Sequence, residues 1–509
     1  MSDIAVAESG TRLQNFLDRA GLRGFPWKTA TILYTISWGW LFIVRDSFWG
    51  DDWDEFKFRG LTNFDYYAFG FAPWKRTIYW LFEAFGPAPI RLLTFVCFYL
   101  SSIFLFGIIK KFEFVEKSSL QSVSLLFLLV PFNTVRVGLN VFFYTTAYMY
   151  FFAAWFCLVC LKSKGAKIIG VALFFLSFQM FTLLVFFVVP MAHYFYIGFQ
   201  KYGFKSLEWI LKNSVLLSLP IIYWLLRSRF WPLTSEYHVI TRNKIVGFLT
   251  VLVIFILLVI ILSVFYYLSK KFRRSLILMS VGISLMFVGY VPYLIYGLVG
   301  YGLNVPVNYL VIMLGRSDWF SRHQILQPLG FSILLIGVIG LLPSIARGFK
   351  SWIVGVILAI SVVFNVAFGF EYVVDHSKQM SIVAALAAKP NRTAGGEIQM
   401  VDQTTFLNAR QRSYRERDWL GLVGLAEGID SAKKLNVVGG CSENPNTRLV
   451  LIQGPETHWQ ALKNWVSDRD MGFKVTVDDT PGACKPEMVT NQRSSGAIPI
   501  LFYFTGAKG

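Results

Sequence analysis

Two adjacent carboxylates, Asp51 and Asp52, stand directly before Trp53 and just after the first long apolar run of the sequence. Like charges this close raise one another's pKa, and partial burial raises it further. A carboxylate in that condition can accept a proton from a sugar hydroxyl as a general base. Asp54 and Glu55 bring the stretch to four carboxylates in five residues, a set that permits a divalent metal such as Mg²⁺ or Mn²⁺ without requiring one.

A solvated acidic loop is the alternative interpretation of this stretch, because Lys57 and Arg59 follow it and can neutralise its charge. The sequence leaves both interpretations open, and it does not choose between Asp51 and Asp52 as the base. The surrounding elements therefore decide which chemistry we expect.

Arginines in other segments are candidates for binding a phosphate group near these carboxylates. Arginine forms bidentate hydrogen bonds with phosphate oxygens. Arg316 lies in a late polar loop, Arg322 and His323 stand where an apolar run begins, and Arg136 follows the break after a short apolar run. An arginine at a helix end near lipid headgroups can instead simply extend its side chain toward water, so a purely structural role for Arg322 stays open.

The composition predicts that lipid surrounds most of this chain. Of its 509 residues, 55% are hydrophobic and 15% are charged, and the mean hydropathy is +0.53. Soluble proteins carry about 25% charged residues. The net charge of +18 would suggest a nucleic-acid partner for a soluble protein. Here the basic residues fall mainly in short gaps between apolar runs, as membrane orientation requires, so we expect membrane lipid and no nucleic acid as a partner.

Eleven apolar runs are candidates for membrane-spanning helices, which need about 20 apolar residues each. Two of the runs are short and end at interruptions, so half-buried helices or one bent pair remain alternatives there. The eleven runs lie at roughly 28–44, 90–109, 120–132 (short), 141–161, 167–178 (short), 180–198, 212–226, 245–268, 275–298, 324–344 and 351–373.

Basic residues in the short loops indicate the orientation of these spans. Lys and Arg accumulate in cytoplasmic loops, and an alternation of eleven spans puts every short basic loop on the side of the N-terminal segment, 1–27. We therefore expect an α-helical, multi-pass membrane domain at 28–373 with a cytoplasmic N-terminus. Its first outer loop, 45–88, then carries the acidic stretch, followed by an amphipathic helix along the interface between about Asp65 and Arg76.

The C-terminal segment, 374–509, has the composition of a soluble domain, and eleven spans place it outside the cytoplasm. A helical stretch near 455–468 alternates with strand-like runs, so we expect a small α/β domain. In an oxidising compartment, Cys441 and Cys484 are a plausible disulfide. The strand-like runs lie at 397–401, 435–439, 448–452, 473–478 and 498–504.

In the order and topology of these features, the chain resembles the GT-C superfamily of membrane glycosyltransferases, which take sugars from polyprenyl-phosphate carriers. The match covers about residues 28–373, and it is best with the bacterial branch that modifies lipopolysaccharide, its O-antigen or other cell-envelope glycans. The matching features are Asp51-Asp52-Trp53 in the first outer loop, the interfacial helix after it, broken early helices such as the one ending at Ser177-Phe178-Gln179, a late Ser321-Arg322-His323…Pro328 element, and an extracytoplasmic C-terminal domain.

The resemblance implies an inverting hexosyl transfer at the outer face of the inner (plasma) membrane. Asp51, or failing that Asp52, would deprotonate a hydroxyl of the glycan acceptor, whose oxygen attacks the anomeric carbon of the lipid-linked donor. Arg322 would stabilise the polyprenyl phosphate as it leaves. The other candidates for binding the donor or the acceptor are His323, Arg316, Lys75, Arg76 and Arg136, with Trp53 stacking on a sugar ring.

Two other functions remain alternatives. An O-antigen polymerase or ligase also uses outward-facing arginines, but it usually places its large soluble loop between two late spans. A non-enzymatic lipid or sugar transporter predicts polar residues along the middle of the membrane and an internal repeat, and the sequence shows neither. The sugar, the acceptor and the role of the C-terminal domain stay open.

Overall fold

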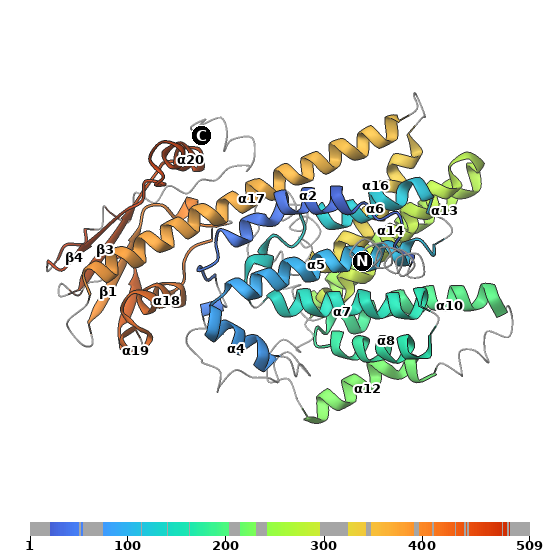
Figure 1. Ribbon diagram of the computed structural model, residues 1–509, viewed down its shortest axis with the longest axis horizontal. Coiled ribbons are helices and arrows are strands. Elements are labelled where there is room, and N and C mark those ends of the chain that lie inside the picture. The colour runs from blue at the N-terminus through green and yellow to red at the C-terminus, as the bar shows by residue number, and fades with distance from the viewer. Residues whose placement is uncertain are drawn as a thin grey trace, which may run out of the picture.

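The computed structural model arranges the chain as a bundle of helices with a small sheet region at one end (Figure 1). The residues that the structure describes are 21–49, 52–53, 75–112, 115–139, 141–161, 163–202, 214–230, 242–295, 324–342, 348–390, 396–409, 412–432, 434–441, 444, 447–480, 482–485 and 488.

Helices form the bundle, and one of them continues into the sheet region. The bundle contains α2 (Trp27–Trp38), η1 (Gly39–Phe42), α4 (Lys75–Phe85), α5 (Ala88–Ile109), α6 (Lys117–Leu129), η3 (Thr134–Val137), α7 (Val141–Cys160), α8 (Lys164–Ser177), α9 (Thr182–Phe186), α10 (Val188–Tyr202), α12 (Ser214–Phe230), α13 (Arg242–Leu268), η6 (Lys270–Phe272), α14 (Arg273–Ile295), α16 (Gln327–Leu341) and α17 (Phe349–Ala388). The sheet region contains β1 (Glu397–Asp402), η9 (Thr405–Leu407), α18 (Glu416–Glu427), α19 (Ile429–Ala432), β2 (Asn436–Gly439), β3 (Arg448–Gln453), α20 (His458–Asp468) and β4 (Lys474–Asp478).

Six helical segments within the described residues are long and apolar enough to cross a membrane, which supports a membrane-embedded protein. The prediction of eleven spans is not confirmed. The run at 28–44 forms the twelve-residue α2 followed by the 3-10 helix η1, and the run at 167–178 forms the fourteen-residue α8. The six segments are Ala88–Ile109, Val141–Cys160, Thr182–Gln200, Lys270–Pro292, Gln324–Leu341 and Phe349–Ala388.

Glycines allow α14 and α16 to pack closely against each other. A Cβ atom added to Gly282 would lie 2.6 Å from the backbone nitrogen of Leu334, and one added to Gly330 would lie 2.7 Å from the carbonyl oxygen of Gly282. Small residues commonly mediate helix association in membranes, because lipid removes the hydrophobic driving force and close packing replaces it. Larger side chains at these positions would separate the two helices.

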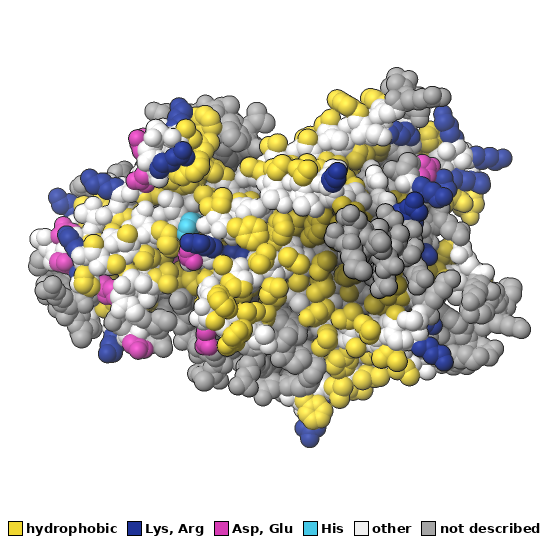
Figure 2. Space-filling view, viewed as in Figure 1, with side chains coloured by type: hydrophobic (Ala, Val, Ile, Leu, Met, Phe, Trp, Pro, Cys, Tyr) yellow, Lys and Arg dark blue, Asp and Glu magenta, His cyan; other side chains and the backbone are white. Residues whose placement is uncertain are grey.

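Hydrophobic side chains cover the outside of the bundle as well as its core (Figure 2). On α13, Val253, Leu257 and Ile261 are 53%, 52% and 49% exposed, as expected for a helix that faces lipid. Lys and Arg side chains gather at the end of the bundle that is remote from the sheet region (Figure 2). The positive-inside rule assigns such an end to the cytoplasm, and the orientation stays a prediction.

The longest helix, α17, connects the bundle to the sheet region. Its 40 residues correspond to about 60 Å, roughly twice the 30 Å hydrocarbon thickness of a bilayer. Its second half packs against α18, α20 and β4. One helix therefore carries the chain from the membrane-embedded part into the sheet region without interruption.

The sheet has the strand order β2-β1-β3-β4, with β1 parallel to β2 and β3 and with β4 antiparallel to β3. Ile398 of β1 pairs with Val437 on one side and with Arg448 on the other. The four strands begin and end within one residue of four predicted runs, and α20 lies within the predicted helical stretch, beginning three residues later and ending at the same residue. The fifth predicted run, 498–504, lies outside the described residues.

The structure joins Cys441, just after β2, to Cys484, after β4, in a disulfide, the same pair that the sequence indicated. The other three cysteines, Cys97, Cys157 and Cys160, are free and belong to helices of the bundle. The covalent link therefore lies in the sheet region alone.

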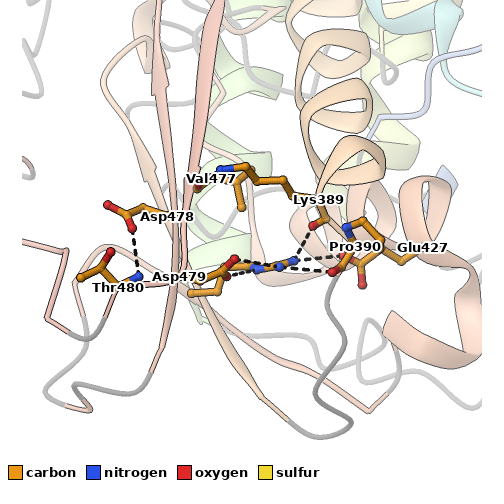
Figure 3. A network of polar contacts seen from close by, with 8 residues as sticks. Lys389, Pro390, Glu427, Val477, Asp478, Asp479 and Thr480 are labelled. Carbon is orange, nitrogen blue, oxygen red and sulfur yellow. Dashed lines mark hydrogen bonds and ion pairs between the residues drawn. The ribbon is translucent and has the colours of Figure 1, made fainter.

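Arg448 fastens the end of α17 to the sheet through Lys389, Glu427 and Asp479, whose positions are labelled in Figure 3. Its Nε donates to the carboxylate of Asp479 at 2.6 Å, and its Nη1 donates to Glu427 at 3.4 Å and to the carbonyl of Lys389 at 2.8 Å. Lys389 in turn donates from Nζ to the carbonyl of Val477 at 3.1 Å. These bonds hold α17, α18 and β4 together at the far end of the molecule.

Candidate functional site

The second half of α17 forms one wall of the candidate site, and η1 and the start of the predicted first outer loop pack against it. Tyr372 stacks on Trp40 with ring centroids 5.2 Å apart and meets Trp49 edge-on at 5.3 Å. Gly369 leaves room for Trp40, because a Cβ atom there would lie 2.2 Å from the indole ring. Further along α17, Nε2 of Gln379 donates to a main-chain carbonyl of the loop at 3.1 Å. Together, η1 and the loop are thus fixed to α17 over about three turns of that helix.

Asp375 joins three segments of this wall. Its side chain is buried and accepts a hydrogen bond from Nε1 of Trp49 at 2.8 Å on one oxygen and from the hydroxyl of Tyr414 on the other. Tyr414 belongs to the sheet region. Burial, and then the charge of Asp375, raise the pKa of Tyr414 well above its usual range, so the phenol keeps the proton that it donates.

Trp53, which directly follows Asp52, packs against α18. Its side chain is 1% exposed, and its ring lies 4.8 Å from that of Phe48. A Cβ atom on Gly421 of α18 would lie 2.1 Å from the indole ring. Trp53 therefore serves packing in this structure, and its stacking on a sugar stays a prediction.

A small pocket lies where the loop, α17 and the sheet region meet. It has room for about one water molecule, and the carboxylate of Asp418 at its edge is already bonded to Nη2 of Arg412 at 2.7 Å. At this size it is a junction between parts of the fold rather than a cavity for a sugar. Its lining consists of Phe48, Trp49, Trp53, Asp375, Gln379, Ala409, Arg412, Tyr414, Asp418 and Leu422.

Asp52, the described member of the acidic pair, is fully buried. Its carboxylate accepts a hydrogen bond from the backbone N–H of Trp49 at 3.3 Å, and its own N–H donates to the Trp49 carbonyl at 3.2 Å, which closes a tight turn. Arg91 supplies a positive charge close enough to interact with Asp52. Asp52 is thus buried and bonded to the backbone of Trp49, its role as a general base stays a prediction, and Asp51 lies outside the described residues.

Arg91 was not predicted from the sequence, although it is a lone charge at the start of an apolar run. Its side chain is buried, and its guanidinium donates to the carbonyls of Val44 and Ser47 and, from Nε, to that of Val137 at 3.4 Å. It also lies 5.1 Å from the ring of Trp49. Arg91 therefore connects the loop that carries Asp52 to η3. Ionisable residues in spans are rare and commonly functional, and this is the signal that could have identified it.

Arg136, one of the predicted substrate-binding residues, points into the bundle from η3. Asn133, with a left-handed φ of 54°, turns the chain between α6 and η3, a conformation that Asn adopts more readily than most residues. The guanidinium of Arg136 lies 3.7 Å from the ring centroid of Trp38 and 3.9 Å from that of Phe98. Its Nη2 donates to the carbonyl of Phe132 at 3.0 Å. The cation is held by aromatic faces and main-chain oxygens.

Polar side chains with unused hydrogen-bonding capacity surround Arg136. Within the described residues it has no carboxylate partner, and its Nη1 has no acceptor. There, too, the side-chain amide of Asn133 and Nε2 of Gln324 lack partners, while Oε1 of Gln324 accepts from the backbone N–H of Asn133 at 3.4 Å. A buried cation without a counter-charge is costly, so this cluster of donors favours an anionic group beside it.

Two further basic candidates, Lys75 and Arg76, begin α4, and only their backbone is described. Trp80 and Phe85 of this helix are 58% and 64% exposed, as on an amphipathic helix at a membrane surface. Residues 54–74, which hold most of the predicted interfacial helix, lie outside the described residues.

The late basic element also lies outside the described residues, which resume at Gln324. Arg316, Arg322 and His323 belong to it, and His323 directly precedes Gln324 in the sequence. In sequence, the predicted phosphate-binding element therefore leads directly into Gln324, which belongs to the polar cluster around Arg136.

A metal at the acidic stretch stays a prediction. Asp54 and Glu55, like Asp51, lie outside the described residues, and Asp52 is engaged with the backbone of Trp49. Elsewhere in the described ranges, three or more His, Cys, Asp or Glu residues do not come together as a metal site would require.

Comparisons with family models, with curated proteins and with solved structures found no match to this chain.

Proposed function

We propose that this protein is a membrane glycosyltransferase of the GT-C type, which transfers a hexose from a polyprenyl-phosphate carrier to a cell-envelope glycan. The observation that carries the proposal is a buried carboxylate, Asp52, linked through Arg91 to the segment that holds the buried cation Arg136. A general base and an anion-binding cation are the two groups that such a transfer needs.

In this mechanism, Asp51, or failing that Asp52, takes the proton from an acceptor hydroxyl. The acceptor oxygen attacks the anomeric carbon and inverts it, while the bond from that carbon to the phosphate oxygen breaks and its electron pair leaves with the polyprenyl phosphate. Arg322 and Arg136 stabilise the phosphate charge, with Arg316 and His323 as further contacts. Aromatic surroundings such as Trp38 and Phe98 strengthen this attraction by excluding water.

We also propose eleven spans, a cytoplasmic N-terminus and an extracytoplasmic sheet region in the inner membrane. Two observations support this orientation. Basic side chains gather at the end of the bundle remote from the sheet (Figure 2), and the Cys441–Cys484 disulfide lies at the opposite end, where an oxidising compartment would preserve it.

The test is sugar transfer in purified membranes supplied with a radiolabelled polyprenyl-phosphate hexose and envelope glycan. If its residue is the base, Asp51→Asn or Asp52→Asn should slow transfer about 10²- to 10⁴-fold, and Arg322→Ala about 10²- to 10³-fold. Asp46→Asn is the matched control, because Asp46 lies in the same loop with its side chain 59% exposed, and this variant should keep wild-type transfer.

Each variant must insert and purify like the wild type before its activity is compared. Wild-type transfer that survives all three changes would keep the enzyme and reject the site. Absence of transfer with several lipid-linked donors would instead favour the polymerase, ligase or transporter alternatives.

A further inference from the structure

Helix α20 of the sheet region exposes large hydrophobic side chains. Trp459 and Trp465 are 41% and 43% exposed, and Val466 is 63% exposed. At 100° per residue, Trp465, Val466 and Trp459 fall on one continuous side of the helix together with Leu462 and Lys463. A soluble domain seldom leaves two tryptophans and a valine open to water on one short helix, so this side is suited to a less polar surface.

A basic side chain accompanies each of the two tryptophans. The Nζ of Lys463 lies 5.8 Å from the ring centroid of Trp459, and the guanidinium of Arg469 lies 5.4 Å from that of Trp465. Tryptophan and basic residues together are typical of the membrane–water interface, where the ring enters the headgroup layer and the cation meets lipid phosphates.

The position of α20 along α17 puts its hydrophobic side at the level where the apolar segment of α17 ends. His458, at the start of α20, interacts with Glu371 of α17, and Ala461 packs in one cluster with Val374 and Phe370. Figure 1 shows α20 beside α17 close to the junction of the bundle and the sheet region. Glu371 is the first charged residue of α17 after Lys350, so α20 lies at the end of the apolar segment of α17.

The apolar surface of α17 leads toward α20. Ile360, Val363 and Val366 are 49%, 62% and 43% exposed on the apolar part of α17. From Val366 to Glu371 the helix rises about 7.5 Å, and the headgroup layer on one side of a bilayer is about 5–8 Å thick. The level of α20 therefore corresponds to that layer, in continuity with a lipid-facing surface.

We propose that α20 lies on the bilayer surface beside α17 and holds the sheet region against it. Trp459, Trp465 and Val466 enter the upper acyl-chain region, while Lys463 and Arg469 bind the phosphates of anionic lipids. Continuity with the lipid-facing residues of α17 favours lipid over a protein as the occupant. This proposal is independent of the proposed enzymatic function.

The experiment places a bimane label on the full-length protein in nanodiscs of phosphatidylcholine with phosphatidylglycerol, some of which carries a doxyl quencher on the acyl chain. Val466→Cys labels the proposed lipid-facing side, and Ser467→Cys, the next position, is also exposed but lies about 100° around the helix. Wild-type protein treated with the same label gives the background from its free cysteines. Quenching should be several-fold stronger at position 466 than at position 467, and equal quenching at both positions would overturn the proposal.

The role of the basic residues has its own test. Lys463→Glu with Arg469→Glu, introduced into the labelled Val466→Cys protein, should lower quenching at position 466 in the anionic nanodiscs. Quenching that is unchanged by this double substitution, and equal in phosphatidylcholine alone, would overturn the binding of anionic lipid.

Discussion

Lys378 and Arg136 are both buried cations, but their surroundings are opposite. Lys378 donates to the carboxylate of Asp402 at 2.5 Å, to the side-chain oxygen of Asn408 and to the carbonyl of Thr404 at 3.4 Å. Arg136 lies against two aromatic rings and bonds to main-chain carbonyls and to Tyr34, without a carboxylate partner among the described residues and with Nη1 unused. One charge has a counter-charge and three acceptors, and the other has no counter-charge.

We propose that this difference distinguishes a structural charge, Lys378, from a charge that binds a ligand, Arg136. The second oxygen of Asp402 accepts from both the N–H and the hydroxyl of Thr404 at 2.9 Å, so the group around Lys378 is complete and fastens α17 to β1. A buried cation that the fold leaves incomplete instead favours binding to an anion. Arg136 is therefore the stronger candidate for contact with a phosphate.

Lys378→Met should have the largest effect on stability. It leaves Asp402 buried without its counter-charge, which costs about 3–5 kcal/mol. Unfolding of the purified protein by denaturant measures the loss, and Lys434→Met, at an exposed position, is the control. Combining Lys378→Met with Asp402→Leu should recover part of the loss, and a loss below about 1 kcal/mol in the single variant would show that the pair is not structural.

Arg136→Met should change stability little and sugar transfer strongly. No carboxylate within the described residues loses a partner, so the free energy of unfolding should change by about 1 kcal/mol or less. Sugar transfer should fall about 10²- to 10³-fold if the guanidinium stabilises the leaving phosphate. Unfolding and transfer are measured on the same preparation, and a variant that unfolds easily but still transfers sugar would reverse our comparison of the two cations.

Gly421→Ala tests whether the contact between α18 and the segment that carries Trp53 depends on close packing. The new methyl group would overlap the ring of Trp53, and overpacking of this kind costs about 1–3 kcal/mol. Limited proteolysis of the first outer loop and the unfolding midpoint both report it. Gly355→Ala on α17, where a Cβ atom meets nothing within 4 Å, should be neutral or stabilising.

Tyr414→Phe should lower stability less than Lys378→Met. It removes one donor to the buried carboxylate of Asp375 while Trp49 continues to donate, so we expect a loss of about 1–2 kcal/mol. Chemical denaturation with Trp fluorescence measures it. A loss as large as that of Lys378→Met would mean that Asp375, rather than Lys378, is the main contact between α17 and the sheet region.

Local patterns were sufficient to predict the apolar helices, the four described strands and the Cys441–Cys484 pair. They did not predict how η1 and the predicted first outer loop dock, because Trp40 meets Gly369 and Trp53 meets Gly421 across more than 300 residues of sequence. Such complementarity is a property of tertiary packing and has no periodicity.

Arg91 was missed for a similar reason, because its contacts are also tertiary. Arg91 bonds to main-chain carbonyls, which every residue type supplies, so its acceptors have no signature in the sequence. The prediction of eleven spans is not confirmed, and apolar length alone does not reveal that the run at 28–44 divides into α2 and η1. Arg136 was a candidate because it follows a break that the sequence does show, and its role stays a prediction.

The unbroken length of α17 gives the molecule a mechanical property. A rod of about 60 Å that tilts by 10° at its membrane end moves its other end by about 10 Å. Spans tilt when the bilayer becomes thinner, and the bonds from Asp375 and Gln379 make the acidic loop travel with this rod. Bilayer thickness would thereby set the distance between Asp52 and the lipid surface, so the same sequence would behave differently in thin and thick membranes.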